Sequence, residues 1–420
     1  ELEDEMTLQH LAEFLRRRVA WVQVRGGVLP LAVMTMAEKE KQEGKPRLVV
    51  ATDCFLPRWD GVARVLNEVL PGLQEDFEVV VVAPDYGPLE NEGFHHVRIP
   101  LQPRVFGDFR PARFKYWRVR REVRRADVVF SQTIGPIGSA AILAAKGAGK
   151  PLACYIHNME SRLVPMAIGP SPLRRWLYPF MRWFTRFLYN RASLLLTPSE
   201  WVDEQLSWDR ISAPKRVVRL GVDTGRFSPG GAKTIRRKLG FSDDDVVVGQ
   251  HGRLAREKDL KTLLRAFVRL RRRREQVKLL IVGEGLDELK EMFSRQEGVV
   301  LAGRQDNVVP YLRAMDVFAL TSMTETTSMS TLEAMSCGLP VVSTPVGFVR
   351  DYIEEGENGF FVPFRDSNAL RDRLEWLADH PEMRRRIGEA GREMVREHFS
   401  WEDTVREIRE ALRGLLPQER

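Results

Sequence analysis

The chain of 420 residues contains only three cysteines, and they are scattered at Cys54, Cys154 and Cys337. No two of them form a C-x-x-C pair, which argues against a structural zinc site and for a reducing cytosol. The sequence opens Glu-Leu-Glu-Asp-Glu, and this is the wrong charge for the first segment of a secretory signal. We therefore expect a cytoplasmic protein.

Long apolar runs and a complete dinucleotide fingerprint are also missing. No uninterrupted apolar stretch approaches the ~20 residues that a helix needs to cross a bilayer. Gly283-Glu-Gly285 lacks the third glycine of G-x-G-x-x-G, which disfavours a dinucleotide oxidoreductase. We interpret Gly283 as part of a tight turn that lets the backbone approach a ligand.

Two successive series of short β-rich runs alternate with helical segments, and the length also suggests two domains. The pattern predicts an α/β protein with two Rossmann-like, doubly wound lobes that face each other across a cleft. The predicted divisions are an N-terminal appendage over residues 1–45, a first lobe over 46–220, a second over 221–398, and a helix over 399–420. Trp401, Val405, Ile408, Leu412 and Leu415 recur at helical spacing, so this last helix is expected to pack back across the lobe boundary.

The appendage allows three interpretations. Leu8, Leu11, Leu15 and Val19 recur at helical spacing. They could form a surface helix or an anchor at a membrane surface, or they could be translated sequence upstream of a start at Met34 or Met36. The first lobe then begins with a predicted strand, Leu48 to Thr52, and a helix from Val62 to Leu70 that Pro71 and Gly72 are expected to stop.

The net charge is +7, and the positive charge gathers in the first half of the chain. The stretch from Leu173 to Tyr189 interleaves arginines with aromatic residues, which suits an anionic membrane surface. A helix with a buried aromatic face and an arginine rim explains the same pattern equally well. Binding of nucleic acid is not expected, although stacking on bases would use similar residues.

The stretch from Ala319 to Pro345 is typical of a strand, a polar loop, a helix and a second strand. Thr327 or Ser328 is predicted to cap the helix, and the free N–H groups at its start, those of Met329, Ser330 and Thr331, would form an anion site. Glu325 and Glu333 stand eight residues apart, a helical span of about 12 Å. An anion between two carboxylates suits a nucleotide diphospho-sugar, with the diphosphate at the helix start and the ribose and the sugar on either side.

Further candidates follow other predicted strands, where parallel sheets bind ligands. Arg253 and Lys258 follow the strand Val246 to His251 and can neutralise a diphosphate without a metal. His157 follows a strand of the first lobe, and Gly61 lies at the first turn of that lobe. The D-x-D spacing of residues 243–245 precedes a strand on the opposite edge. We interpret it as a solvated turn, so we expect neither a metal nor a cofactor.

Several motifs in order resemble the retaining glycosyltransferases of family 4, which have the GT-B fold. The resemblance covers residues from about Arg47 to Ser400. Its motifs are Phe55-Leu-Pro-Arg-Trp-Asp-Gly-Val62, Thr197-Pro-Ser199, Arg219 to Pro229, Gly252-Arg-Leu-Ala-Arg-Glu-Lys258, the E-x7-E pair Glu325 and Glu333, and Gly338-Leu-Pro-Val-Val342. After the first glutamate the family usually has an aromatic residue and then glycine, where this chain has Thr327 and Ser328.

The resemblance implies metal-independent transfer of a hexose from a nucleotide diphospho-sugar, with retention at the anomeric carbon. By this likeness Arg253 and Lys258 hold the diphosphate, and Glu333 takes the ribose hydroxyls. Glu325 faces the donor sugar, and His157 lies near the reacting centre. The basic first half suggests a lipid or lipid-linked glycan acceptor at the cytoplasmic membrane face. A soluble sugar or sugar-phosphate acceptor is the alternative among enzymes, and a non-catalytic nucleotide-sugar-binding protein is the alternative of another class.

Overall fold

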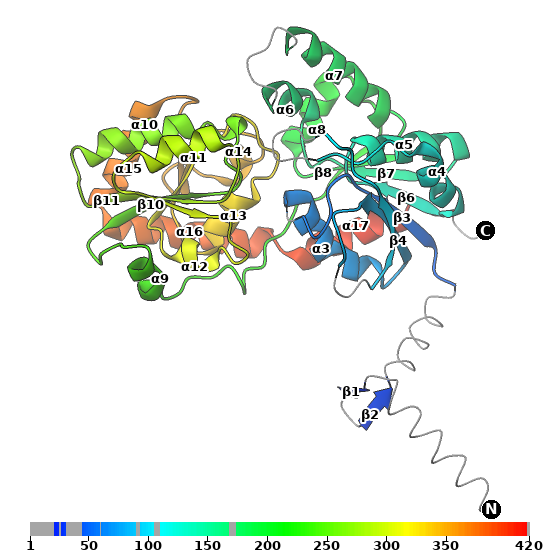
Figure 1. Cartoon of the computed structure of the whole chain (residues 1–420), viewed down its shortest axis with the longest axis horizontal. Helices are drawn as coiled ribbons and strands as arrows, with labels where there is room; N and C mark the ends of the chain where they lie inside the picture. The colour runs from blue at the N-terminus through cyan, green and yellow to red at the C-terminus, as the bar shows by residue number, and fades with distance from the viewer. Residues whose placement is uncertain are drawn as a thin grey trace, which may run out of the picture.

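The computed structural model describes residues 21–24, 27–30, 44–58, 60–89, 93–104, 110–167 and 174–417. Figure 1 shows two lobes side by side, linked by one green stretch and one red stretch of the chain. Strands β1 (Trp21–Val24) and β2 (Gly27–Pro30) pair antiparallel in a sheet of their own. The periodic leucines at the start of the chain and Trp59 lie outside the described residues.

The N-terminal lobe is built on a seven-stranded parallel sheet in the order β5-β4-β3-β6-β7-β8-β9. Its strands are β3 (Arg47–Ala51), β4 (Glu78–Pro84), β5 (His95–Ile99), β6 (Val128–Ser131), β7 (Leu152–Tyr155), β8 (Leu194–Thr197) and β9 (Lys215–Val217). Most of these runs are apolar and wholly buried because helices cover both faces of a parallel sheet.

The helices of this lobe are α3 (Gly61–Leu73), α4 (Tyr116–Arg125), α5 (Pro136–Ala148), α6 (Glu160–Ala167), α7 (Arg174–Tyr189) and α8 (Glu200–Trp208). Helices α4, α5 and α7 bury their apolar residues with one face of the sheet, which presents Val49 and Ala51. Helix α3 and the last helix of the chain, α17 (Trp401–Arg413), cover the other face, which presents Leu48 and Val50.

The C-terminal lobe has a six-stranded parallel sheet in the order β12-β11-β10-β13-β14-β15. Its strands are β10 (Val246–His251), β11 (Val277–Val282), β12 (Val299–Gly303), β13 (Val317–Leu320), β14 (Val341–Ser343) and β15 (Gly359–Phe361). Its helices are α9 (Lys233–Lys238), the 3-10 turn η1 (Arg256–Lys258), α10 (Leu260–Arg271), α11 (Asp287–Ser294), α12 (Val309–Arg313), α13 (Met329–Ser336), α14 (Val349–Tyr352), α15 (Ser367–Asp379) and α16 (Pro381–His398).

The chain crosses between the lobes twice, and the two crossings lie together. The amide of Val222 donates to the carbonyl of Phe399 at 3.0 Å. The hydroxyl of Thr404 accepts from the amide of Gly221 at 2.9 Å and donates to the carbonyl of Arg219 at 2.7 Å. A Cβ on Gly221 would lie 2.4 Å from the carbonyl carbon of Ser400, so glycine is needed for this close approach.

The structure confirms the predicted α/β fold with two doubly wound lobes and a C-terminal helix that returns over the boundary. The helix α3 does not stop at Pro71 and Gly72 as predicted but continues to Leu73. Packing explains the difference, because Leu70 and Leu73 are buried and Gly72 contacts Val405 of α17. This burial outweighs the one hydrogen bond that proline removes.

Among the described helices, none is both long and apolar enough to span a membrane.

Candidate active site

The loops after β10 and β13, neighbouring strands in the middle of the C-terminal sheet, are joined to each other. The hydroxyl of Thr321 donates to the carbonyl of Lys258 at 2.8 Å, and the amide of Met323 donates to the carbonyl of Glu257 at 2.7 Å. These bonds place the Lys258 ammonium 2.5 Å from Glu325 Oε1, with both side chains largely buried. The structure therefore brings together Lys258 and Glu325, which the sequence predicts at one edge of the sheet.

The predicted partner cation, Arg253, lies on the same loop but pairs differently. Its guanidinium donates to Glu257 Oε1 at 2.8 Å, and its side chain is 49% exposed. The loop that carries it is fixed by Gly283, because a Cβ there would lie 2.0 Å from the carbonyl oxygen of Gly252. Gly283 thus brings two loops into backbone contact, and its φ of 143° is one that glycine adopts readily.

The second carboxylate, Glu333, is fully buried inside α13. Its Oε2 lies 2.9 Å from His251 Nε2, and its Oε1 forms an ion pair with Arg64. Neither oxygen has a partner in hydrogen-bonding geometry among the described residues. Burial, with smaller effects from Arg64 and Lys258, lowers the pKa of His251 to about 3, so this ring is neutral at pH 7 and Arg64 carries the positive charge of the cluster.

The start of α13 differs in part from the prediction. Ser328 occupies the cap position, yet its side chain makes no capping bond and its backbone is left-handed, with φ of 54°. The amide of Thr331 donates to the carbonyl of Ser328 at 3.0 Å, so only the N–H groups of Met329 and Ser330 remain without a backbone acceptor in the described chain. The predicted trio of free amides is therefore a pair.

The loop between the two glutamates is held from the C-terminal lobe itself. A Cβ on Gly347 would lie 2.2 Å from the carbonyl oxygen of Glu325. The amide of Phe348 donates to the carbonyl of Thr326 at 2.8 Å, and the Tyr352 hydroxyl donates to the carbonyl of Thr327 at 3.3 Å. These contacts fix the backbone on which Glu325 stands.

The N-terminal lobe meets this loop at His157, two residues beyond the end of β7. Its carbonyl accepts from the Thr326 hydroxyl at 2.5 Å, and its Nε2 lies 2.8 Å from Gln132 Oε1. Burial lowers the pKa of His157 to about 3, which makes it a neutral ring. His157 therefore adjoins the residue after Glu325.

Gly61 is the first residue of α3, which is capped by the Asp60 carboxylate on the amide of Ala63 at 3.0 Å. A Cβ on Gly61 would meet nothing within 4 Å, so space next to this helix start is open. Arg64 lies one helical turn further on, and it was not among the predicted site residues. A single arginine on an amphipathic helix usually marks a solvated face, and the sequence gives no sign that the lobes bring it to Glu333.

Two family profiles match the chain in succession: Glycosyltransferase Family 4 over residues 59–226 and glycosyl transferases group 1 over residues 231–394. A GDP-mannose-dependent alpha-mannosyltransferase from Mycobacterium tuberculosis is 30% identical over 328 residues, which cover 76% of this chain and 84% of that protein. The chain belongs to glycosyltransferase family 4. The family inferred from the sequence motifs is thereby confirmed.

This family 4 glycosyltransferase is also similar to other curated proteins and to solved structures. The alpha-monoglucosyldiacylglycerol synthase of Streptococcus pneumoniae is 25% identical over 333 residues, covering 74% of this chain and 73% of that protein. The fold resembles that of HepE from Anabaena, solved with UDP and glucose, with a TM-score of 0.72, 20% identity, and coverage of 88% of this chain and 100% of HepE. Against several other curated relatives the chain spans 59–64% of their own length.

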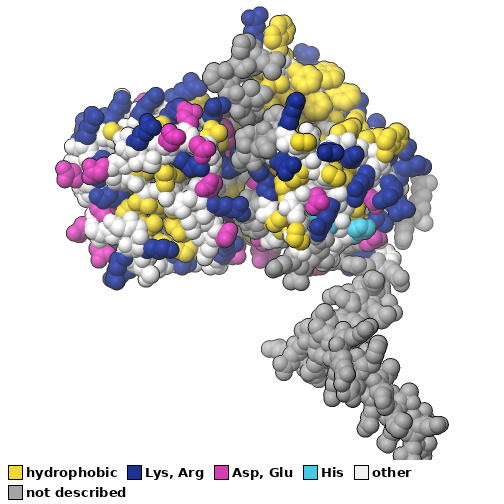
Figure 2. All heavy atoms as spheres, viewed as in Figure 1, with side chains coloured by type: hydrophobic (Ala, Val, Ile, Leu, Met, Phe, Trp, Pro, Cys, Tyr) yellow, Lys and Arg dark blue, Asp and Glu magenta, His cyan; other side chains and the backbone are white. Residues whose placement is uncertain are grey.

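The family 4 chain also carries an exposed aromatic surface on α7. Trp176, Tyr178, Phe180 and Trp183 are 69%, 41%, 53% and 57% exposed. Figure 2 shows hydrophobic side chains gathered over this helix at the top of the N-terminal lobe, with Lys and Arg beside them. Further along the helix, Phe184 stacks on Phe180 and Phe187 stacks on Trp183. This C-terminal half of α7 packs Phe184, Phe187, Leu188 and Tyr189 against the lobe.

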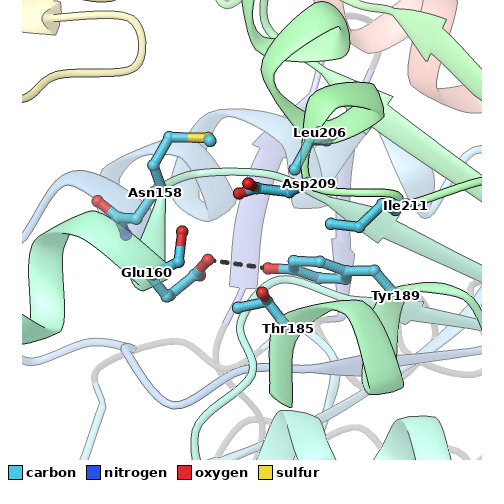
Figure 3. Close-up of a pocket in the computed structure, with 9 residues that line it drawn as sticks. Asn158, Glu160, Thr185, Tyr189, Leu206, Asp209 and Ile211 are labelled. Carbon is cyan, nitrogen blue, oxygen red and sulfur yellow. Dashed lines mark hydrogen bonds between the residues drawn. The ribbon is translucent and has the colours of Figure 1, made fainter. Parts of the chain in front are cut away.

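A small cavity with both polar and apolar lining residues lies beneath α7 and beside the start of α6 (Figure 3). In it the Tyr189 hydroxyl donates to Glu160 Oε2 at 3.1 Å. Burial raises the pKa of Glu160 to about 7, although the bond from Tyr189 lowers it slightly. All of its lining residues belong to the N-terminal lobe, and the first of them, Asn158, directly follows His157 in the chain.

Proposed function

We propose that this glycosyltransferase moves a hexose from a nucleotide diphospho-sugar to a lipid or lipid-linked acceptor, with retention and without a metal. The observation that carries the proposal is the Lys258–Glu325 pair, which stands at the carboxyl ends of neighbouring strands and close to the start of α13. That edge of a doubly wound sheet is where ligands bind. The motifs of the family assign the same two residues to the donor.

In the proposed reaction, residues of the C-terminal lobe stabilise the departing diphosphate. The bond between the anomeric carbon and the diphosphate oxygen breaks, and the acceptor hydroxyl oxygen bonds to that carbon from the same face. The proton of that hydroxyl passes to the departing diphosphate oxygen. Lys258 and Arg253, with the free amides of Met329 and Ser330, stabilise the negative charge of the departing diphosphate. Since these groups supply positive charge where other enzymes use a divalent ion, we expect EDTA to leave the rate unchanged.

Glu325 and Glu333 orient the two ends of the donor in this proposal. Glu325, paired with Lys258 in the unliganded protein, turns to the hydroxyls of the donor sugar when Lys258 meets the diphosphate. Glu333 accepts the ribose hydroxyls, and its two oxygens without hydrogen-bonding partners support this role. His157, as a neutral ring, contacts the sugar beside the reacting carbon.

The lipid acceptor and peripheral attachment to the cytoplasmic membrane face rest on the α7 surface. Exposed aromatic rings flanked by Arg175 and Arg186 suit the level of lipid headgroups. A relative named for a diacylglycerol product supports the acceptor class. A soluble sugar or sugar-phosphate acceptor is the second candidate, since other relatives are named D-inositol 3-phosphate glycosyltransferases.

The test is a screen of nucleotide diphospho-sugars with lipid and soluble acceptors, followed by NMR of the product at the anomeric carbon. Glu325→Gln and Lys258→Ala should each reduce turnover by about a hundredfold to a thousandfold, the range for removing one electrostatic contact at a reacting centre. Arg236→Ala, which breaks an ion pair remote from the cleft, is the control. Full turnover by either site variant would contradict the assigned roles, and an inverted product would contradict retention.

A further inference from the structure

The Arg64–Glu333 ion pair joins the two lobes directly across the candidate site. Arg64 comes from α3 of the N-terminal lobe and Glu333 from α13 of the C-terminal lobe. The Glu333 side chain is 0% exposed and that of Arg64 is 27% exposed. Because the two charges come from different lobes, this contact exists only while the lobes are in this arrangement.

The same carboxylate cannot serve Arg64 and a ribose at once. The two ribose hydroxyls must donate to the Glu333 oxygens in regular hydrogen-bonding geometry. Arg64 lies against Oε1, and His251 lies 2.9 Å from Oε2. Because the Glu333 side chain is fully buried and Arg64 lies directly against Oε1, a ribose hydroxyl reaches that oxygen only when Arg64 moves away. His251 stands at the other oxygen and does not compete for Oε1.

A nearby anion would give the displaced guanidinium a new partner. In a nucleotide the diphosphate is attached to the 5′ position of the ribose that Glu333 holds, so it arrives within reach of a long side chain at Glu333. The planar fork of arginine matches two phosphate oxygens as it matches a carboxylate. Arg226, exposed and close enough to lower the pKa of Arg64 through its like charge, adds to the positive field there.

We propose that Arg64 is a donor-binding residue of the N-terminal lobe that exchanges Glu333 for the diphosphate when the nucleotide-sugar enters. The inference rests on the proposed function, and it adds a residue from the opposite lobe. In the empty protein Arg64 satisfies the Glu333 charge and holds the lobes together. In the complex it neutralises part of the leaving group from the acceptor side.

The exchange predicts opposite effects of one substitution on two related ligands. A nucleoside has the ribose without phosphate, so it competes with Arg64 and gains nothing from it. Arg64→Ala should therefore bind uridine or guanosine more tightly than the wild type. UDP or GDP should bind about tenfold or more weakly to the variant, since a charged bond to phosphate is lost.

The experiment is calorimetric titration of the full chain with UDP, uridine, GDP and guanosine. Arg64→Lys keeps the charge but loses the fork, so it should retain intermediate affinity for the diphosphates. Arg236→Ala removes a comparable arginine from a carboxylate within the C-terminal lobe. It should change the affinity for neither the nucleosides nor the diphosphates. Thermal unfolding of each variant shows whether it is folded. If Arg64→Ala does not fold, Arg64→Lys takes its place as the test variant.

Equal weakening of nucleoside and diphosphate would show a purely structural role and overturn the inference. Tightening of both would show that Arg64 only blocks Glu333 and never reaches the phosphate, and this too would overturn it. Unchanged affinities of Arg64→Ala for all of these ligands would also overturn the inference. If the folded wild type binds none of the four ligands, a UDP- or GDP-sugar donor is excluded, and with it the exchange proposed for Arg64. If the wild type binds the diphosphates and the Arg64→Ala variant binds them equally well, only the role of Arg64 is contradicted.

Discussion

At the residue scale, Ser328 holds a left-handed backbone conformation at the turn between Glu325 and α13, where related family members usually have glycine. Its φ of 54° costs a residue with a Cβ about 1–2 kcal/mol relative to glycine. Its hydroxyl shares a hydrogen bond with that of Thr331 at 2.8 Å, which offsets part of this cost. The turn is therefore left-handed at a residue that has a Cβ, with the hydroxyl contact as partial compensation.

We expect Ser328→Gly to be more stable than Ser328→Ala by about 1 kcal/mol, because both lose the hydroxyl and only alanine keeps the Cβ. Urea unfolding of the two variants measures the difference. Both variants lose the same hydroxyl hydrogen bond, so the difference between their free energies of unfolding reports the cost of the left-handed backbone conformation alone. Equal midpoints and slopes would mean that Ser328 does not hold this conformation in solution.

Glu160 is a second residue whose behaviour follows from its surroundings. Its pKa of about 7 in the folded chain stands above the ordinary carboxyl value because burial disfavours the charged form. Folding favours the protonated form, so the contribution of Glu160 to the free energy of unfolding depends on pH. This contribution is fully present below the unfolded pKa of about 4.5 and is lost as the pH rises through the folded pKa of about 7. The loss is on the order of 1–3 kcal/mol.

Glu160→Gln should accordingly unfold at a higher temperature than the wild type at pH 8, and at nearly the same temperature at pH 5. Differential scanning calorimetry across this range gives the comparison. The amide keeps the shape and an acceptor for the Tyr189 hydroxyl, so packing changes little. A gap that is constant with pH would assign the effect to packing rather than to ionisation.

At the scale of elements, helix α7 packs its C-terminal half against the lobe and leaves the aromatic residues of its N-terminal half exposed. The residues that pack against the lobe and the residues that stay exposed are both aromatic. For this reason the sequence supported two interpretations equally, a membrane-binding surface and a helix with a buried aromatic face. Exposure separates them: Trp176 and Trp183 are more than half exposed, and Phe187 packs against the core. A ring that remains exposed on a monomer marks a candidate contact surface.

Replacing Trp176 and Trp183 together by alanine should weaken binding to anionic phosphatidylglycerol vesicles about tenfold or more, since two large rings no longer enter the interface. Replacing Arg175 and Arg186 by glutamine should mainly reduce the dependence of binding on salt. Vesicle flotation at low and high salt measures both. Phe364→Ala, an exposed aromatic of the C-terminal lobe, is the control. A wild type that does not bind vesicles at low salt would exclude the membrane surface.

The elements themselves were largely predictable because a buried parallel strand is a short apolar run. The strand β10, Val246–His251, has the predicted bounds. The strands β5 (His95–Ile99) and β9 (Lys215–Val217) were not predicted, since these edge strands are half exposed and carry His, Lys or Arg. Polar residues on an edge hide the apolar pattern.

At the scale of the whole molecule, the sequence predicts contacts within a sheet edge better than contacts between lobes. Lys258 and Glu325 follow neighbouring strands of one sheet, and strand order alone brings them together. Arg64 meets Glu333, and Thr326 meets His157, only through the relative placement of two separately folded lobes. No periodicity or motif encodes that placement. It follows from the paired crossings at Gly221 and Phe399 and from the position of α17.

Helix α17 follows the C-terminal lobe in the chain but belongs to the core of the N-terminal lobe. Ile408 and Leu412 are buried with Leu48, Val50 and other residues of that lobe. Arg409 pairs with Asp76 at 2.7 Å and with Glu75 at 2.6 Å, both just beyond α3. The N-terminal lobe is therefore incomplete until the last residues of the chain are in place.

Ile408→Ala should lower the free energy of unfolding by about 2–5 kcal/mol, as large-to-small changes in a core do. Its effect should fall on the distant N-terminal lobe rather than on the adjacent α16. Hydrogen exchange followed by mass spectrometry would show faster exchange in β3, β4 and α3 and little change in β10 and β11. Arg406→Ala, on the exposed side of the same helix, should leave both lobes protected. Faster exchange confined to the C-terminal lobe would mean that α17 stabilises the lobe it follows, and the lobes would then be free to fold in the order of the chain.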